Sequence, residues 1–325
     1  MRTIERRGAV VGACVLVLSA LGACSRDKPA RPTDSAPAAP PVAIPAPPEA
    51  PSVVASRWDR AAGQALLVRG ESGESFVIVP GEGGEAATDR TPGAVADVLP
   101  GEVALFSRAG ASGHAKATPT DAASPSGCAW PAARLGPASG ADAVPAWTVG
   151  FVGASPAPIA LDSIEGAAPG DSATLAATVT RLAAGLRDDT VRTFRGVPFA
   201  VAAARRFTIG DGDTARDALV ATITRSLNQE AAPLSERVLL VAERPRAAAG
   251  ATAAPWTVVY HERVAGREDE VPATDVLAAV TLGQGAEARP TLVLARALAD
   301  GTRFTLLERT DEGWRPRWTS ATRGC

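Results

Sequence analysis

Nine prolines crowd residues 25–52, SRDKPARPTDSAPAAPPVAIPAPPEAPS, and most of the other positions are Ala, Ser or charged. Proline fixes φ and lacks a backbone N–H, so this stretch cannot build a packed core and favours extended polyproline II. Fully extended, it spans roughly 90 Å at about 3.1 Å per residue. We interpret it as a tether; a proline-rich ligand for a partner domain is the alternative. The folded region is then confined to residues 53–325, enough for one large domain or two smaller ones.

Residues 1–23 have the layout of an export signal. A basic start, MRTIERRG, precedes the uncharged run 9–23, AVVGACVLVLSALGA. This run is shorter than the roughly 20 apolar residues of a membrane-spanning helix, and small residues close it.

The run ends in Leu21-Gly22-Ala23-Cys24, which resembles the lipobox of bacterial lipoproteins. The resemblance covers the first 24 residues alone. It implies that the Cys24 thiol receives a diacylglycerol, that cleavage occurs just before Cys24, and that the chain is extracytoplasmic and lipid-anchored. In a cell with two membranes, Ser25 in place of Asp after Cys24 implies the outer membrane, on its periplasmic or surface side. An ordinary secretory signal or an uncleaved anchor is the alternative to a lipoprotein signal.

Charge gives no reason to expect a nucleic-acid partner. Loss of residues 1–23 removes three Arg and one Glu, which moves the formal net charge from −2 to −4. A nucleic-acid binder needs a basic surface instead. The partners we expect are the lipid bilayer, through acylated Cys24, and proteins of the envelope.

Two cysteines remain after the signal and the lipid anchor are accounted for. Cys14 leaves with the signal, whereas Cys128 and Cys325 form an even pair in an oxidising compartment, so we predict a disulfide between them. Two unpaired thiols are the alternative.

Strand patterns dominate the first half of the folded region. Residues 64–70 (QALLVRG) and 75–81 (SFVIVPG) flank a short polar turn, which predicts a hairpin. Residues 102–108 and 147–152 predict further strands. Gly, Ala, Ser and Thr dominate residues 109–126, which we interpret as a loop or a link between subdomains. On this view residues 53–122 form a small β subdomain and residues 126–325 the main domain.

One helix is expected near 171–187. Asp171-Ser172 offers an N-cap, and apolar side chains then recur at helical spacing, with an end near Asp188-Asp189. The recurring residues are Leu175, Val179, Leu182 and Leu186.

The second half returns to strands, at 239–244, 256–263, 291–296 and 304–309. The two pairs look alike at an offset of about 50 residues, which suggests a repeated β-meander. Three strands end in Glu-Arg, which we expect to form charge pairs at a solvent edge. The fold class is therefore mainly β (α+β): antiparallel meanders and hairpins with one clear amphipathic helix.

Gly170-Asp171-Ser172 resembles the opening motif of the GDS serine esterases over three residues. A serine hydrolase needs a base, and the chain holds only His114 and His261, neither preceded by Asp at the family's Asp-x-x-His spacing. Helix capping explains Asp171 and Ser172 more simply, so we assign no catalytic residue.

Asp211, Asp213 and Asp217 in GDGDTARD have oxygen ligands at calcium-loop spacing. The segment resembles the Asp-Gly loops of FG-GAP-type propeller repeats, although Thr214 and Ala215 interrupt the run. A tight polar turn is the alternative. We otherwise expect no cofactor and no other metal.

Two further segments invite a functional interpretation. Asn228, Gln229 and Glu230 line either a polar pocket or an exposed loop. In the tail, alternation predicts that Trp314, Pro316 and Trp318 face one way, as a ligand surface or, preferably, as core. In the structural interpretation Trp318 and Trp130 cover the predicted disulfide.

These observations suggest a membrane-anchored envelope lipoprotein that acts as a non-catalytic binding or assembly module. An extracytoplasmic hydrolase with unidentified acidic catalytic residues is the alternative. No family is recognised for residues 53–325.

Overall fold

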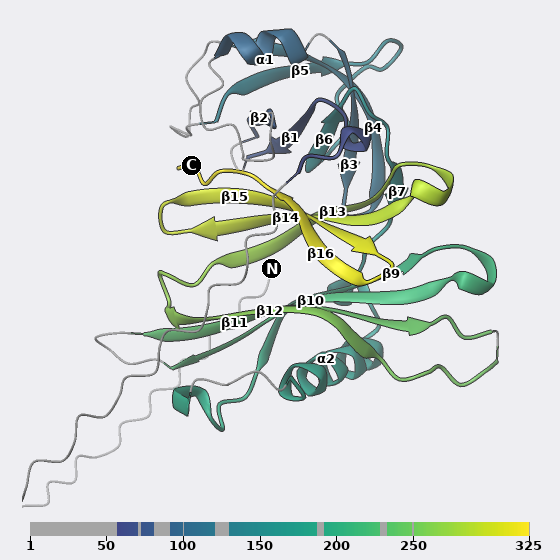
Figure 1. Ribbon diagram of the computed structural model, residues 1–325, viewed down its shortest axis with the longest axis vertical. Helices are drawn as coiled ribbons and strands as arrows, with labels where there is room; N and C mark the ends of the chain where they lie inside the picture. The colour runs from purple at the N-terminus through teal and green to yellow at the C-terminus, as the bar shows by residue number, and fades with distance from the viewer. Residues whose placement is uncertain are drawn as a thin grey trace, which may run out of the picture. The chain divides into compact units, whose positions relative to one another are not determined.

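Two four-stranded meanders follow one another in the chain, and each forms the body of an antiparallel sheet (Figure 1). They appear in a computed structural model of the chain, whose described residues belong to one compact unit, Pro51–Cys325. The structure describes residues 57–70, 73–80, 92–99, 101–120, 130–186, 192–227, 233–248 and 250–324.

The first sheet has the strand order β12-β11-β10-β9-β8, and we call it the helix sheet. Its strands are β8 (Asp162–Ser163), β9 (Ala200–Ile209), β10 (Arg216–Leu227), β11 (Leu234–Pro245) and β12 (Thr257–Arg267).

The second sheet has the order β16-β15-β14-β13-β7, and we call it the barrel sheet. Its strands are β7 (Ala157–Ile159), β13 (Ala273–Leu282), β14 (Arg289–Leu298), β15 (Gly301–Thr310) and β16 (Gly313–Thr319). Because β7 and β8 are separated by only two residues, one short stretch of chain pairs with the first strand of both meanders.

The remaining strands close into a barrel of order β1-β2-β5-β4-β3-β6. They are β1 (Ala65–Arg69), β2 (Ser75–Ile78), β3 (Gly101–Ser107), β4 (Gly110–Thr120), β5 (Ala132–Pro137) and β6 (Val149–Val152). The short helix α1 (Pro92–Val98) contributes Val95 to the barrel interior. The barrel takes strands from both sides of the 122–126 boundary that the sequence suggested.

Alternation along the strands creates a stack of apolar layers. Leu239 and Val241 face the barrel sheet and pack with Leu292 and Trp314, whereas Leu240 faces the opposite way, toward helix α2 (Pro169–Ala184). The outer face of the barrel sheet packs on the barrel through Phe304 and other residues. Burial of this size is what stabilises a chain with few aromatic side chains.

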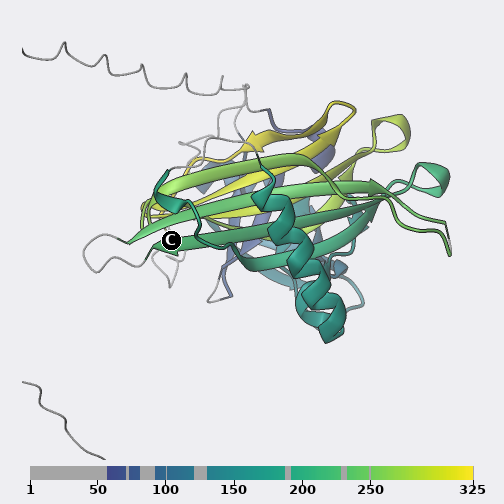
Figure 2. The same ribbon diagram turned by 90° about the horizontal axis from the view of Figure 1, so that it is seen from below.

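Helix α2 crosses the outer face of the helix sheet (Figure 2). It buries Leu175 and Val179, while Leu182 and Leu186 pack at the margin, so the expected apolar face is confirmed. The expected N-cap is wrong. Ala168 occupies that position, and the helix ends at Ala184 rather than near 188. Pro169 suits the first turn, because its missing N–H has no intrahelical partner there.

The mainly β, antiparallel fold class is confirmed, and the expected strands at 64–70, 75–81, 102–108 and 147–152 contain β1, β2, β3 and β6. No helix in the described ranges is long and apolar enough to cross a membrane.

The interpretation of residues 109–126 as a loop is wrong for residues 110–120, which form β4. This strand pairs along its length with β3 and β5. Only Gly110, Ala115 and Ala117 are buried, so its small side chains face the barrel interior where larger ones would not fit beside Leu105. Hydrophobic alternation was therefore too weak to reveal it.

The expected repeat offset of about 50 residues is wrong by one strand. It pairs β11 with β14, whereas the order of the meanders makes β11 correspond to β15. The turns that open the two meanders show the correspondence: GDGDTAR ends at Arg216 and GQGAEAR ends at Arg289, 73 residues later. Each turn contains a 3-10 helix, Gly212–Thr214 or Gly285–Glu287.

Candidate functional site

A surface hollow of about 470 Å³ lies between helix α2 and the segment that leads into β12. Because α2 buries Leu175 and Val179 against the sheet, its opposite side presents Thr174 and Arg181 to solvent. The hollow is lined by Asp171, Thr174, Leu175, Thr178, Arg181, Leu182, Arg206, Arg244, Ala254, Pro255 and Trp256.

Trp256 and Arg244 form the centre of this hollow. The guanidinium carbon of Arg244 lies 4.4 Å from the centroid of the Trp256 ring. Nε and Nη2 of Arg244 also lie 3.2 Å from Oδ2 of Asp217 on the neighbouring strand. A cation stacked on an indole and paired with a carboxylate is held in one orientation, so the ring and the guanidinium form a rigid wall.

A second hollow, of about 440 Å³, shares Arg206, Arg244 and Trp256 with the first. It extends toward β7 and β8, where Pro158 and Asp162 line it. The two hollows are therefore one continuous surface, which we call the arginine groove.

The arginine groove carries cations that the described part of the chain does not neutralise. Arg181 and Arg206 are exposed and have no ion pair with any described residue, and Arg246 donates a 3.0 Å hydrogen bond to the neutral Oγ1 of Thr208. Asp217 is already paired with Arg244. The groove thus presents unpaired positive charge beside an aromatic ring, in a chain whose overall charge is negative.

Other charged side chains are buried in ion pairs. Glu243 lies between the two sheets with 2 % of its side chain exposed, where Nε of Arg309 donates a 2.7 Å hydrogen bond to it and Nε of Arg216 lies 2.8 Å away. Burial alone would raise the pKa of Glu243, but the hydrogen bonds from Arg309 and Trp314 hold this pKa below its usual value.

Glu262 forms a second such cluster between the sheets. Arg296 from β14 donates two hydrogen bonds to it, of which Nη2 to Oε2 is 2.7 Å. Burial opposes ionisation, yet these bonds lower the pKa of Glu262 and raise the pKa of Arg296. Burial, together with the neighbouring Glu262, raises the pKa of Tyr260 to about 12.

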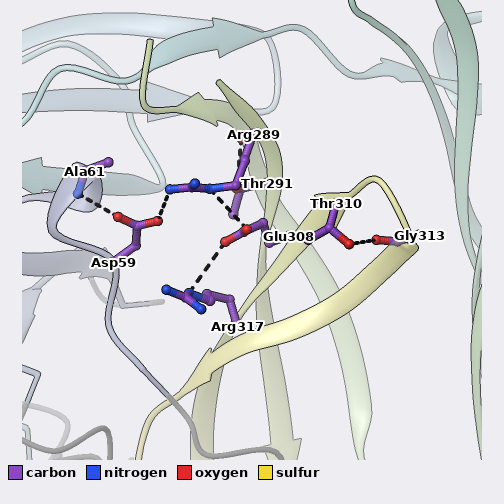
Figure 3. A network of polar contacts seen from close by, with 8 residues as sticks. All are labelled: Asp59, Ala61, Arg289, Thr291, Glu308, Thr310, Gly313 and Arg317. Atoms are coloured by element: carbon purple, nitrogen blue, oxygen red, sulfur yellow. Dashed lines mark hydrogen bonds and ion pairs between the residues drawn. The ribbon is translucent and has the colours of Figure 1, made fainter. Parts of the chain in front are cut away.

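Glu308 occupies the place in the second meander that Glu243 has in the first (Figure 3). Nε of Arg289 lies 3.1 Å from it and Nε of Arg317 lies 3.7 Å away. Nη2 of Arg289 also lies 2.5 Å from Asp59, which accepts a 2.8 Å hydrogen bond from the backbone N–H of Ala61. This network attaches the segment before β1 to the barrel sheet.

These clusters correct the expectation that the Glu-Arg strand ends form charge pairs at a solvent edge. Glu243 and Glu308 are buried, and the partners of Glu243 and Glu262 come from both sheets. Strands that end at the rim of one sheet lie beneath the other sheet, and this juxtaposition is not visible from one strand alone.

The structure uses the Gly170-Asp171-Ser172 motif inside helix α2. The Ser172 hydroxyl donates to the carbonyl oxygens of Ile164 at 2.7 Å and Ala167 at 3.3 Å, so it closes the turn before the helix. His114 lies on β4 of the barrel, with Nδ1 3.1 Å from Glu102. His261 lies on β12.

The candidate calcium loop contains the turn before β10. Asp211 precedes the 3-10 helix and is exposed, whereas Asp217 turns to Arg244 in the arginine groove. Among the side chains that the structure describes, no group of three or more metal-ligating residues comes together. The side chain of Asp213 lies outside the described set, so calcium stays a prediction.

The expectation that Trp314, Pro316 and Trp318 share one face is wrong. A β-bulge between the pairs Leu306–Trp318 and Leu307–Pro316 reverses the alternation. Trp314 packs between the two sheets and Trp318 packs toward the barrel. The interpretation of the tail tryptophans and Trp130 as core is confirmed, because all three are buried. A similar bulge separates Val258 from Tyr260 on β12.

Several predicted residues lie outside the described ranges. They are Cys24, Cys128 and Cys325, together with Asn228, Gln229 and Glu230.

Sequence reasoning missed the arginine groove. Its central residues, Arg206, Arg244 and Trp256, come from three different strands or their flanks. The sequence signals that could have found it were the aromatic residue that opens WTVVYHER and the Asp217 that comes after Arg216, but strand pairing alone joins them.

The fold and the site define an antiparallel β protein with a six-stranded barrel, a two-sheet sandwich and an arginine- and tryptophan-lined groove. Comparisons with protein-family models, with curated proteins and with solved structures each find no match.

Proposed function

We propose that this chain is a lipid-anchored lipoprotein of the cell envelope whose globular region is a non-catalytic binding module. The lipid anchor and the location rest on the lipobox at residues 21–24. The binding role rests on the arginine groove, where unpaired guanidinium groups lie beside a rigidly held tryptophan.

The groove suits an extended segment of a partner protein that combines acidic and apolar side chains. Arg181 and Arg206 attract carboxylates, and the exposed parts of Pro255 and Trp256 accept apolar side chains. The two adjoining hollows provide an elongated surface rather than a single deep cavity, which fits an extended segment.

The buried carboxylates support binding over hydrolysis. A catalytic general acid near neutral pH needs a raised pKa, but the pKa values of Glu243 and Glu262 are lowered by their arginine partners. These groups are held as permanent anions inside the sandwich, where they serve packing of the two sheets.

The groove is tested with three labelled octapeptides, of alternating Glu and Leu, Lys and Leu, and Glu and Ser. We expect saturable binding of the Glu-Leu peptide, weaker binding of the Glu-Ser peptide, none of the Lys-Leu peptide, and weakening as salt rises. The double variant R181E/R206E should abolish binding and W256A should reduce it.

R134E is the matched control, because Arg134 is an exposed arginine on β5 of the barrel. Equal loss of binding in R134E and R181E/R206E, or equal affinity for all three peptides, would refute the groove as the binding site. The anchor is tested separately: C24S should move the protein from the membrane fraction to the soluble fraction.

A further inference from the structure

The far end of the sandwich from the arginine groove holds a second cavity, of about 330 Å³, which we call the sandwich mouth. Asp217 of the groove lies near the start of β10, whereas the mouth is lined by Thr224 and Ser226 near the end of that strand. Its lining residues are Ala202, Thr222, Ile223, Thr224, Ser226, Ser235, Arg237, Val238, Leu239, Glu262, Val264, Glu268, Pro272, Ala273 and Thr274.

A change of side-chain character along β10 creates this cavity. Ala218 and Val220 point between the sheets and belong to the apolar core. The same alternation brings Thr222, Thr224 and Ser226 to that face next, at intervals of about 7 Å. The inter-sheet space is therefore apolar at one end and lined with hydroxyl groups at the other.

Hydroxyl groups converge on the mouth from three strands. Ser235 on β11 is buried, and its Oγ lies 3.5 Å from Oγ of Ser226. Thr274 on β13 faces the cavity from the barrel sheet. A hydroxyl both donates and accepts hydrogen bonds, so this lining complements a ligand whose own groups do the same.

The charged groups at the mouth do not favour an anion. Nη1 of Arg237 donates a 2.7 Å hydrogen bond to the carbonyl of Val271, which fixes the guanidinium at the wall. Glu262 and Glu268 lie in the same lining, and Glu262 is already paired with Arg296. The cavity therefore offers one anchored cation, carboxylates and hydroxyls, as a neutral polar ligand requires.

From this combination we propose that the sandwich mouth is a binding site for a saccharide unit. The volume falls at the lower end of the range for small-molecule pockets, about 300–1,000 Å³, which suits one or two sugar rings. The threonines and serines bind ring hydroxyls, and Arg237 and Glu262 supply a directional donor and acceptor at fixed positions. The site is independent of the arginine groove, because the two lie at opposite ends of β10.

The test measures binding of glucose, galactose, N-acetylglucosamine and galacturonate to the chain by ligand-observed NMR and calorimetry. We expect saturable binding of at least one of the neutral sugars. The double variant T222V/T224V keeps the side-chain shapes and removes two hydroxyls, so it should weaken that sugar about tenfold. T118V is the control, because Thr118 lies on β4 of the barrel, away from the sandwich.

Three outcomes overturn the proposal: no sugar binds the wild-type chain, T222V/T224V binds as tightly as T118V, or galacturonate alone binds. A variant that fails to fold is recognised by its unfolding curve, and S226A then replaces it, because Ser226 is exposed at the rim. R181E/R206E should bind sugar normally, so failure of the groove proposal does not alter this result.

Discussion

Trp314 and Glu243 belong to different sheets, and the indole Nε1 of Trp314 donates a 2.7 Å hydrogen bond to Oε1 of Glu243. Arg309 donates to the same carboxylate from the same sheet as Trp314. A single buried anion therefore ties the last two strands of the second meander to the first meander. Its removal should loosen the contact between the sheets.

The substitution E243Q should lower the free energy of unfolding by about 3 kcal/mol, because it leaves Arg309 and Arg216 without a counter-charge. The measurement is urea unfolding at neutral pH. E312Q is the matched control: Glu312 is 87 % exposed and should change stability by less than about 0.5 kcal/mol. Similar losses for both variants would show that Glu243 contributes nothing through its burial.

Stability should fall in acid because the pKa values of Glu243 and Glu262 are lowered in the folded protein. Their contribution is complete above the unfolded pKa of about 4.3 and is lost as the pH falls through the folded pKa. Urea unfolding between neutral pH and acid should show this decline. The double variant E243Q/E262Q should decline less steeply, and an unchanged slope would contradict the assignment.

Tyr260 is the one tyrosine of the chain, so ultraviolet titration reports it alone. The midpoint should lie near 12 in the folded protein and near 10 in urea. Since the folded pKa is raised, this group's contribution to stability is complete below about 10 and is lost as the pH rises toward 12. E262Q should lower the folded midpoint, because Glu262 disfavours the tyrosinate. A folded midpoint near that of the urea-unfolded chain would contradict the burial of the phenol.

Gly301 begins β15 at a φ of 140°, and a Cβ there would lie 2.0 Å from the carbonyl oxygen of Arg323. That carbonyl accepts a 2.8 Å hydrogen bond from the N–H of Thr302, which holds the chain end against the sheet. G301A should therefore cost more than about 1 kcal/mol in thermal or urea unfolding. G101A is the control, because a Cβ at Gly101 meets nothing within 4 Å. Equal stability of the two variants would refute the close approach.

The predicted disulfide between Cys128 and Cys325 gains support from its neighbours. The guanidinium carbon of Arg323 lies 5.1 Å from the ring centroid of Trp130, so residues two positions from each cysteine are in contact. C128S and C325S should each lower stability by about 3–5 kcal/mol, because the bridge closes a long loop. C24S should leave the unfolding curve unchanged. Alkylation of both thiols in the unreduced protein would contradict the bridge.

Parts of the fold were predictable because the signal is local. Alternation in QALLVRG and SFVIVPG is enough to predict β1 and β2, and helical spacing is enough to predict the buried face of α2. β4 was missed since its buried positions are glycine and alanine, which carry little hydrophobic signal. The bulge near Trp318 was missed because an extra residue in a ladder depends on the partner strand.

The amino-acid sequence alone determined the mainly β class, the proline-rich tether and the resemblance that suggests a lipid anchor at Cys24. Composition and short-range periodicity carry that information. Tertiary structure decided which arginines are paired inside the protein and which line the groove. Arg309 meets Glu243 only because two sheets stack, and Arg206 lies in one hollow with Trp256 only because the strands between them pair. Contacts between residues distant in the chain depend on register and packing, which no local pattern encodes.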